Sequence, residues 1–399
     1  MIIPQVLSRD YIKSLAESFL SLSFNITGLI AGFLLSSYFN VFNSFPWTFI
    51  LYPGILSVRG AIGGLFSGRL STGLHLGIYE PSLRNNTKDA YLLFNTITVL
   101  TLISSIFMGV VSSLFSFLQG AARLADIPII FLVVLATMGL SIVLISPFTY
   151  GFSVVSYRRG FDPDMVVYPV ISTFSDIIVT LCYVGVLVLV KTFNGMQWMI
   201  LILVDILFIY MVMKVVKENR GEEDFRETIR EFIMTLSVIS VIVNITGSAL
   251  GKITEIIGKS LEIYTVYPAL IDTVGDAGSI VGSTATTKMF LGTLPSSITA
   301  VRHHLKEISS SWIATLILFE VYAFISSLIY GLNLLPLLTL RLLTVNLLLI
   351  PMIILISIGT AVVTINRGLD PDNFVIPIET SISDGLTTII LYAILTITN

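Results

Sequence analysis

Long apolar stretches, too many to be buried in the core of a soluble domain, constrain the fold of this chain more than any other feature. A helix needs roughly 20 apolar residues to cross the bilayer core, and stretches of that length recur from one end of the sequence to the other. Only 12% of the 399 residues are charged, whereas soluble domains carry about 25%. The sequence therefore predicts an all-α polytopic membrane protein whose surroundings are a lipid bilayer.

Polar residues interrupt the apolar stretches and predict eleven membrane-spanning helices. Two of these stretches, near residues 46 and 262, are longer than the bilayer is thick, so we expect them to tilt, break or protrude. The expected spans are residues 12–37, 46–80, 90–118, 127–156, 163–192, 196–216, 228–251, 262–294, 311–334, 336–365 and 371–397.

Basic residues in the loops predict the orientation, because short cytoplasmic loops collect lysine and arginine. Most loop lysines and arginines fall on the side of the N-terminus, and only a scattered set lies on the other. We therefore expect a plasma membrane protein with a cytoplasmic N-terminus and an external C-terminus. The first set includes Arg9, Lys13, Arg84, Lys88, Arg158, Arg159, Lys217, Arg302, Lys306 and Arg367; the second is Arg123, Lys191, Lys252 and Lys259.

An internal repeat organises the chain. The stretch RG-x-DPD ends both halves, and residues 159–176 are identical to residues 367–384 at nine of eighteen positions. NITG and YP also occur once in each half and in the same order, at residues 25–28 and 244–247 and at residues 52–53 and 267–268. Both NITG copies lie inside expected spans, so we do not interpret them as glycosylation sites.

The repeat predicts three segments: a first five-helix unit at residues 1–195, a linking transmembrane helix at residues 196–222 and a second five-helix unit at residues 223–399. Two five-helix units in direct series would point in opposite directions, and the linking helix restores a parallel orientation. We expect a pseudo-two-fold axis along the membrane normal, with a pathway where the units meet.

Two aspartates precede the prolines that open the fifth helix of each unit. Asp162 before Pro163 and Asp370 before Pro371 fit helix N-caps, and a role in cation binding remains an equal alternative. Asp164 and Asp372 follow in the first turn, where we expect solvated side chains near the cytoplasmic boundary.

Asp176 and Asp384 lie fourteen residues further on, roughly 21 Å along a helix and well inside the bilayer. Intramembrane aspartates are costly and usually face a partner or an aqueous path. Pro169 and Pro377 each free a backbone carbonyl one turn earlier, and carboxylate and carbonyl oxygens suit hard cations such as Mg²⁺. We expect Asp176 and Asp384 to line a cation path; a buried ion pair with Arg59 is the alternative.

The two glycine-rich helices that open with YP differ in charge. In the second half Asp272 and Asp276 share one helix face, which indicates two further cation ligands. The corresponding helix of the first half carries Arg59 and Arg69 instead, so we expect an asymmetric path. Arg59 is expected to neutralise an aspartate, and Arg69 to extend its charge toward water.

At these residues the chain resembles the membrane domain of MgtE-type magnesium transporters. The resemblance rests on the duplicated DPD…P…SD stretch, on RLST-x-LHLG at residues 69–77 and on YPAL…GD-x-GS…TTK at residues 267–288. It is nearest to the tandem-repeat branch that includes the eukaryotic solute carrier relatives. It implies that Asp176 and Asp384 help to hold hydrated Mg²⁺ in a central pore, with the role of the DP aspartate carried by Asp162 and Asp370.

The chain differs from the family pattern in two respects. Many single-repeat relatives have asparagine before the helix proline, where this chain has Tyr168 and Ile376. Barely ten residues precede the first expected span, so we expect no regulation by a cytosolic magnesium-sensing domain. The fused repeat resembles what single-repeat relatives build as a homodimer, and we expect a monomer with an internal pseudo-dimer.

The sequence thus predicts a divalent cation transporter, with Mg²⁺ as the transported ion, no catalytic cofactor and no enzyme activity. Mn²⁺ and Co²⁺ remain open as substrates, and exchange against Na⁺ or H⁺, which efflux would need, is the main alternative. An intramembrane aspartyl protease and a scaffold or receptor are distant alternatives. The net charge of −3 gives no surface for nucleic acid. A histidine-based zinc site is disfavoured, because His75 stands alone in the sequence and His303 and His304 lack a third ligand.

Overall fold

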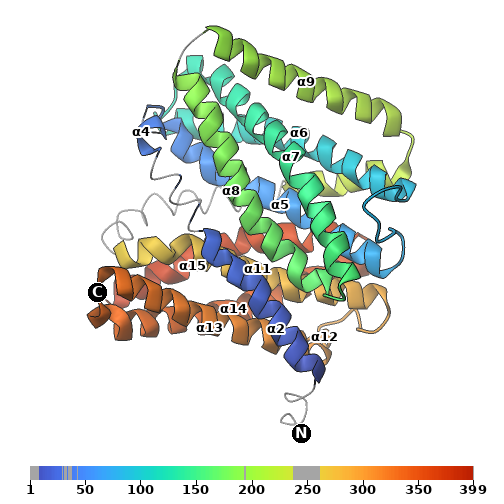
Figure 1. The fold of residues 1–399 in the computed structure, drawn as a ribbon, viewed down its shortest axis with the longest axis vertical. Coiled ribbons are helices and arrows are strands. Elements are labelled where there is room, and N and C mark those ends of the chain that lie inside the picture. Colours follow the sequence, from blue (N-terminus) through green and yellow to red (C-terminus); the bar gives the residue numbers. More distant parts are fainter. Residues whose placement is uncertain are drawn as a thin grey trace.

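The computed structural model describes residues 9–28, 30, 34, 38–42, 44–192, 195–236 and 261–398. Every regular element within these residues is a helix (Figure 1). The second NITG copy and most of the expected span 228–251 lie outside the described residues.

The helices follow the two halves of the sequence. In Figure 1, helices α5 to α9 occupy the upper part of the molecule, and α11 to α15 lie together in the lower part. The first half contains α2 (Arg9–Ser23), η1 (Phe24–Gly28), α4 (Phe39–Phe42), α5 (Trp47–His75), α6 (Lys88–Leu118), η2 (Leu124–Asp126), α7 (Ile127–Arg158), α8 (Pro163–Lys191) and the linking helix α9 (Gly195–Asn219). After the helical residues 223–236, the second half contains α11 (Leu261–Phe290), α12 (Ala300–His303), α13 (Leu305–Tyr330), η3 (Leu332–Leu334), α14 (Leu335–Asn366), η4 (Pro371–Asn373) and α15 (Val375–Thr398).

Eight helices of the described chain are long and apolar enough to cross a membrane. They coincide with eight of the eleven expected spans, from α5 to α9 and from α13 to α15. The remaining three spans, at residues 12–37, 228–251 and 262–294, stay predictions. One of them corresponds to α11, a continuous helix of 30 residues that carries Asp272 and Asp276 in its interior.

Four helices, two from each half, form the centre of the molecule. Helix α8 contacts α5 and α11, and α15 contacts the same two helices. These are the helices that carry the DPD stretches and the glycine-rich stretches of the sequence. The other membrane helices pack outside them, with α6, α7 and α9 on one side and α13 and α14 on the other.

The two halves exchange their first helices. Helix α2 belongs to the first half, yet it packs against α13, and its Leu22 lies in the apolar core of the second half. Conversely, Phe225, Phe232 and Leu236 from the start of the second half lie in the apolar core of the first. Each half is therefore completed by a helix from the other.

The DP stretches form helix caps in both halves. Asp162 has an extended backbone, and its Oδ1 accepts a hydrogen bond of 3.1 Å from the backbone N–H of Asp164. Asp370 does the same for Asp372, also at 3.1 Å. The N-cap interpretation is confirmed for both aspartates. The halves differ just after the cap, because α8 continues from Pro163 whereas a 3₁₀ turn precedes α15.

Helix prolines free two backbone carbonyls, and both of them are already hydrogen-bonded. Because Pro169 has no N–H, the carbonyl of Met165 lacks its intrahelical donor. Ser21 of α2 donates to this oxygen at 2.8 Å. In the second half Thr235 donates at 3.0 Å to the carbonyl of Asn373, four residues before Pro377. Each carbonyl oxygen keeps a second lone pair, so the expectation that these carbonyls help to bind a cation stays a prediction.

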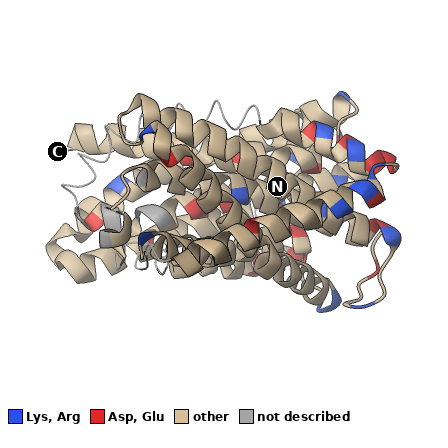
Figure 2. Ribbon diagram, turned by 90° about the horizontal axis from the view of Figure 1, so that it is seen from above, with Lys and Arg blue, Asp and Glu red and all other residues tan. Residues whose placement is uncertain are grey.

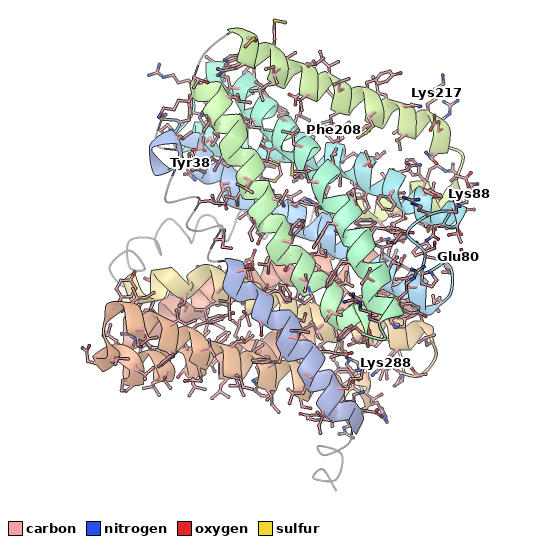
Figure 3. The ribbon with its side chains drawn as sticks, in the orientation of Figure 1. Tyr38, Glu80, Lys88, Phe208, Lys217 and Lys288 are labelled. Carbon is pink, nitrogen blue, oxygen red and sulfur yellow. The ribbon has the colours of Figure 1, made fainter. Side chains whose placement is uncertain are left out.

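Charged residues concentrate at one end of the helices. Figure 3 shows Lys88, Lys217 and Lys288 together at the end opposite Tyr38, and Figure 2 shows few charges on the long outer surface. Lys88 Nζ contacts Glu222 Oε1 at 2.7 Å at this end. The outer face of α9 is apolar, as expected for contact with lipid.

Candidate functional site

Carboxylates from both halves meet between the central helices. Asp176 of α8 interacts electrostatically with Asp272 and Asp276 of α11 and with Asp384 of α15, and Asp384 also interacts with Asp272. Asp176, Asp272 and Asp384 are half-buried, and Asp276 is buried. The four intramembrane aspartates singled out in the sequence are thus brought together. Asp162 and Asp370 instead lie at the starts of their segments, about 21 Å away along the helix direction.

Asp276 is held by polar residues but keeps one free oxygen. Ser172 donates to its Oδ1 at 2.9 Å, whereas its Oδ2 has no hydrogen-bond partner among the described residues. Asn25, from the first NITG copy, lies beside it and accepts a 2.7 Å hydrogen bond from Thr173. Asn25 is fully buried, so its role is internal, and a glycosylation site is excluded in the folded protein.

Glu379 is a fifth carboxylate in this cluster, and it was not predicted from the sequence. It is fully buried on α15, and its Oε2 accepts a hydrogen bond of 2.8 Å from Ser279. Its Oε1 has no hydrogen-bond partner among the described residues. Gly278 provides the space, because a Cβ there would lie 2.2 Å from Oε1. The repeat aligns Glu379 with Ile171, so the comparison of the two halves gives no sign of this carboxylate. An acid inside an apolar stretch is nevertheless a sign of a functional residue.

Arg59 of α5 is the basic residue next to this cluster. Its side chain is buried, and none of its nitrogens has a hydrogen-bond partner within the described part of the chain. It interacts electrostatically with Asp176. The expected neutralisation of an aspartate therefore acts at a distance, without a direct ion pair.

Arg69 binds aspartates of the second half instead of extending into water. Its Nη2 lies 2.6 Å from Asp370 Oδ2, its Nη1 lies 3.2 Å from Asp224 Oδ1, and its Nε donates to Asn373 at 3.1 Å. Only 10% of the Arg69 side chain is exposed. The expectation of a solvated arginine is wrong, because acidic partners more than 150 residues away surround it.

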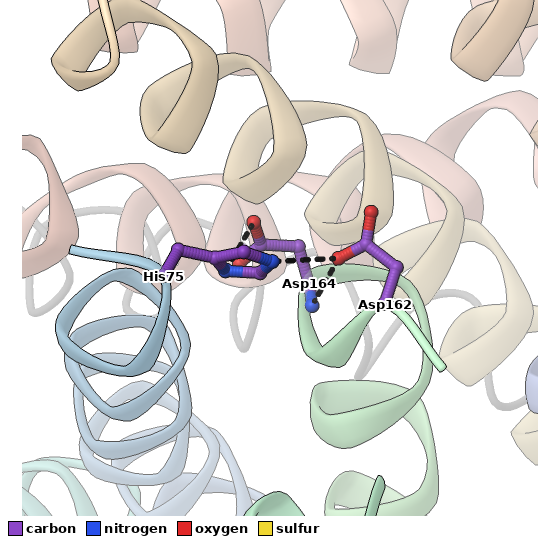
Figure 4. A group of neighbouring side chains, drawn as sticks. All are labelled: His75, Asp162 and Asp164. Atoms are coloured by element: carbon purple, nitrogen blue, oxygen red, sulfur yellow. Dashed lines mark hydrogen bonds and ion pairs between the residues drawn. The ribbon is translucent and has the colours of Figure 1, made fainter. Parts of the chain in front are cut away.

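The corresponding aspartates of the first half have a different partner. His75, the last residue of α5, faces both Asp162 and Asp164 (Figure 4). Its Nε2 lies 3.9 Å from Asp162 Oδ1, and its Nδ1 lies 3.9 Å from Asp164 Oδ2. His75 is therefore not isolated from other potential ligands, as the sequence suggested. Asp164 is also buried, as is Asp372, so both expectations of a solvated side chain are wrong.

The other two histidines form no comparable three-ligand group among the described residues. His303 is exposed, whereas His304 is fully buried and its Nε2 lies 2.9 Å from Thr284 Oγ1. Burial lowers the pKa of His304 to about 4, against the opposing effect of Glu307. His304 is therefore neutral at pH 7.

With this geometry in place, comparison with known families gives a clear result. A model of the MgtE divalent cation transporters matches residues 52–186 and, a second time, residues 267–394. The chain belongs to the MgtE family of divalent cation transporters. Two matches along one chain are consistent with the tandem repeat expected from the sequence. Neither a curated protein nor a solved structure gave a match.

Both MgtE segments contain the acidic residues described above. Asp162 and Asp176 fall in the first matched segment, and Asp272, Asp276, Asp370, Glu379 and Asp384 fall in the second. The basic residues Arg59 and Arg69 also lie inside the first segment, so the asymmetry arises within the MgtE domain itself.

Tyr168 and Ile376, which precede the helix prolines, meet at one glycine of α5. A Cβ on Gly64 would lie 2.3 Å from Ile376 Cγ2 and 3.4 Å from Tyr168 Cε2. Both side chains are buried. At the position where many single-repeat MgtE proteins have asparagine, this chain thus uses two bulky side chains to pack the central helices against α5.

Proposed function

We propose that this MgtE family protein transports Mg²⁺ through an acidic path between its two halves. The observation that carries the proposal is the convergence of five carboxylates on three central helices, one of which, Asp176, also interacts with the buried guanidinium of Arg59. Such a cluster needs positive charge for neutralisation. Oxygen donors suit Mg²⁺, which keeps several waters and binds through one or two carboxylates. In this proposal Asp176, Asp272, Asp276 and Asp384 contact the ion, and Glu379 joins them.

We also propose a pseudo-two-fold axis between α5 and α11, with residues 1–195 and 223–399 as the related units. Thr72 and Thr287 stand at equivalent distances from the two YP pairs, and their hydroxyls lie 3.4 Å apart. The contacts of the DP caps are also repeated: the N–H of Asp162 donates to Glu17 at 3.4 Å, and that of Asp370 donates to Glu231 at 3.3 Å. These pairs support an internal pseudo-dimer, and we propose that it functions as a monomer.

The membrane potential is sufficient to drive uptake. A divalent cation that crosses the full field toward a negative interior gains about 4.6 kcal/mol per 100 mV. No coupling ion is needed in this direction, whereas efflux would require exchange.

The proposal is tested by measuring Mg²⁺ flux into dye-loaded proteoliposomes under an inside-negative potential, with protein-free liposomes as the control. We expect flux that increases with the potential and needs no Na⁺ or proton gradient. Flux that appears only with such a gradient would identify an exchanger. Absence of flux under every gradient would contradict transport.

The orientation can be tested by labelling single cysteines in a Cys182→Ser background. Arg84→Cys, on an exposed loop, and Arg302→Cys, exposed on the short helix α12, are expected to react with an impermeant maleimide from the cytoplasmic side. Arg123→Cys, also exposed, is expected to react from the outside. Labelling of Arg84→Cys and Arg302→Cys from opposite sides would contradict parallel repeats.

Arg59 is expected to weaken Mg²⁺ binding, because its charge competes with the ion for Asp176. Arg59→Met should therefore increase the apparent Mg²⁺ affinity at least about tenfold, since a unit charge several ångströms away contributes roughly 2 kcal/mol or more at an effective dielectric constant of 20. Arg59→Lys, which keeps the charge, serves as the matched control and should resemble the wild type. Equal affinities of the methionine and lysine variants in the concentration dependence of flux would show that this charge has no influence.

A further inference from the structure

His75, Asp162 and Asp164 form a group with the donors and spacing of a metal site. The side chains come from the end of α5 and the start of α8, and one ligand atom from each lies within 4.8 Å of the others (Figure 4). Two atoms that bind one metal ion at about 2.1 Å lie roughly 3 to 4 Å apart. The 3.9 Å between His75 Nε2 and Asp162 Oδ1 already falls in this range.

The imidazole of His75 is oriented as in metal sites. Its Nδ1 lies 3.0 Å from the carbonyl oxygen of Ser71, which can only accept, so Nδ1 carries the proton. Tyr157 packs edge-on against the ring, with the centroids 5.6 Å apart and the planes at 84°. Metal-binding histidines usually donate their second N–H to such a carbonyl, which fixes the tautomer and the ring. The Nε2 lone pair is left facing Asp162.

The two carboxylates lack the cationic partner that their counterparts have. In the second half Arg69 neutralises Asp370. Among the described residues, neither Asp162 nor Asp164 forms an ion pair with a lysine or arginine. Asp164 is nevertheless buried, with Ser283 donating to its Oδ1 at 2.7 Å. The His75 nitrogen that lies 3.9 Å from Asp164 Oδ2 is Nδ1, so Asp164 stands beside the pair formed by Nε2 and Asp162. A cation bound at that pair would offset the repulsion between the two carboxylates.

We propose that His75, Asp162 and Asp164 bind a divalent transition metal ion of the Mn²⁺, Co²⁺, Ni²⁺ and Zn²⁺ class. Imidazole nitrogen suits these ions, whereas Mg²⁺ takes oxygen ligands. The capping hydrogen bond to Asp162 uses only one of its acceptor positions. The site lies at the basic end of the helices and is separate from the central carboxylates. It therefore distinguishes imidazole-binding cations from Mg²⁺ at this end of the protein.

Solvent reaches this site. The side chains of His75 and Asp162 are 24% and 36% exposed. A cavity of about 170 Å³, lined in part by Lys13, Glu17 and Asp162, opens beside it. An ion can thus reach this site without passing the intramembrane cluster.

The inference is tested by calorimetric titration of the full chain in detergent with Zn²⁺, in excess Mg²⁺ to fill oxygen-only sites. His75→Gln and Asp162→Asn are the test variants, since asparagine keeps the helix cap. His303→Gln removes an exposed histidine elsewhere and is the matched control. We expect the wild type and the control to bind one more Zn²⁺ per chain than the two test variants, whose affinity at this site should fall at least about tenfold. Pulsed EPR with Mn²⁺ should show ¹⁴N coupling that His75→Gln abolishes.

Three results would overturn the site. If His75→Gln binds Zn²⁺ as the wild type does, the imidazole is not a ligand. If Mg²⁺ displaces Zn²⁺ equally from the wild type and His75→Gln, the binding group contains only oxygen donors. If the wild type shows no Zn²⁺ binding in excess Mg²⁺, the three residues do not form a transition-metal site. None of these results depends on flux, so they leave the transport proposal untouched.

Discussion

Asp176→Asn and Asp384→Asn are each expected to reduce Mg²⁺ flux at least about tenfold, because each removes one charge that attracts the ion inside the bilayer. The amide has nearly the size of the carboxylate, and neither aspartate side chain is fully buried, so we expect folding to be retained. The measurement is voltage-driven Mg²⁺ flux in proteoliposomes with equal amounts of protein. A decrease in both variants would indicate that both halves contribute to one path.

Asp205→Asn is the matched control for these variants. Asp205 is a buried aspartate of the linking helix α9, outside both MgtE segments. Asp205→Asn also removes one carboxylate from a membrane-spanning helix, but it should leave Mg²⁺ flux unchanged. If Asp205→Asn lowers flux as much as Asp176→Asn does, loss of any buried acid impairs the protein, and the central path has no support.

Gly278→Ala is expected to destabilise the protein by about 1 to 3 kcal/mol, the usual cost of extra volume in a packed core. The new Cβ would lie 2.2 Å from Glu379 Oε1 and 2.4 Å from Ile353 Cγ2, so both side chains must shift. Glu379 is not free to turn, because Ser279 holds its other oxygen. We expect a lower unfolding temperature in detergent and reduced flux, since the carboxylate is displaced from the cluster.

Gly359→Ala provides the comparison. Gly359 lies in α14, and a Cβ there would meet nothing within 4 Å. Alanine also favours helix more than glycine by about 1 kcal/mol in soluble hosts, so this variant should be as stable as the wild type or more. Equal unfolding temperatures for the two alanine variants would contradict the close packing of Glu379 on α11.

The sequence was informative wherever a local pattern determines the structure. The order Asp-Pro predicts a cap and a first-turn proline, and both caps formed at Asp162 and Asp370. A carboxylate inside the bilayer is costly, so it usually faces a partner or an aqueous path. It could therefore be predicted that one path is lined by Asp176, Asp272, Asp276 and Asp384.

The partners of the charged residues could not be predicted, because they come from distant parts of the chain. Arg69 binds Asp370, 301 residues away, across the boundary between the halves. His75 faces Asp162 only because the end of α5 meets the start of α8. No periodicity within one helix indicates such pairs. Glu379 could not be found from the repeat for another reason, because the equivalent position of the first half is Ile171.

The exchange of first helices also determines when the protein can finish folding during synthesis. Helix α2 binds α13 through Ser14 and Ser310, whose hydroxyls lie 2.9 Å apart. Helix α13 is made about 300 residues after α2, which at 5 to 20 residues per second is a delay of roughly 15 to 60 s. Throughout this time the buried polar face of α2, with Ser14, Glu17 and Ser18, lacks its final partner. Helix α2 is thus synthesised long before α13, and its native contacts with α13 can form only after that delay.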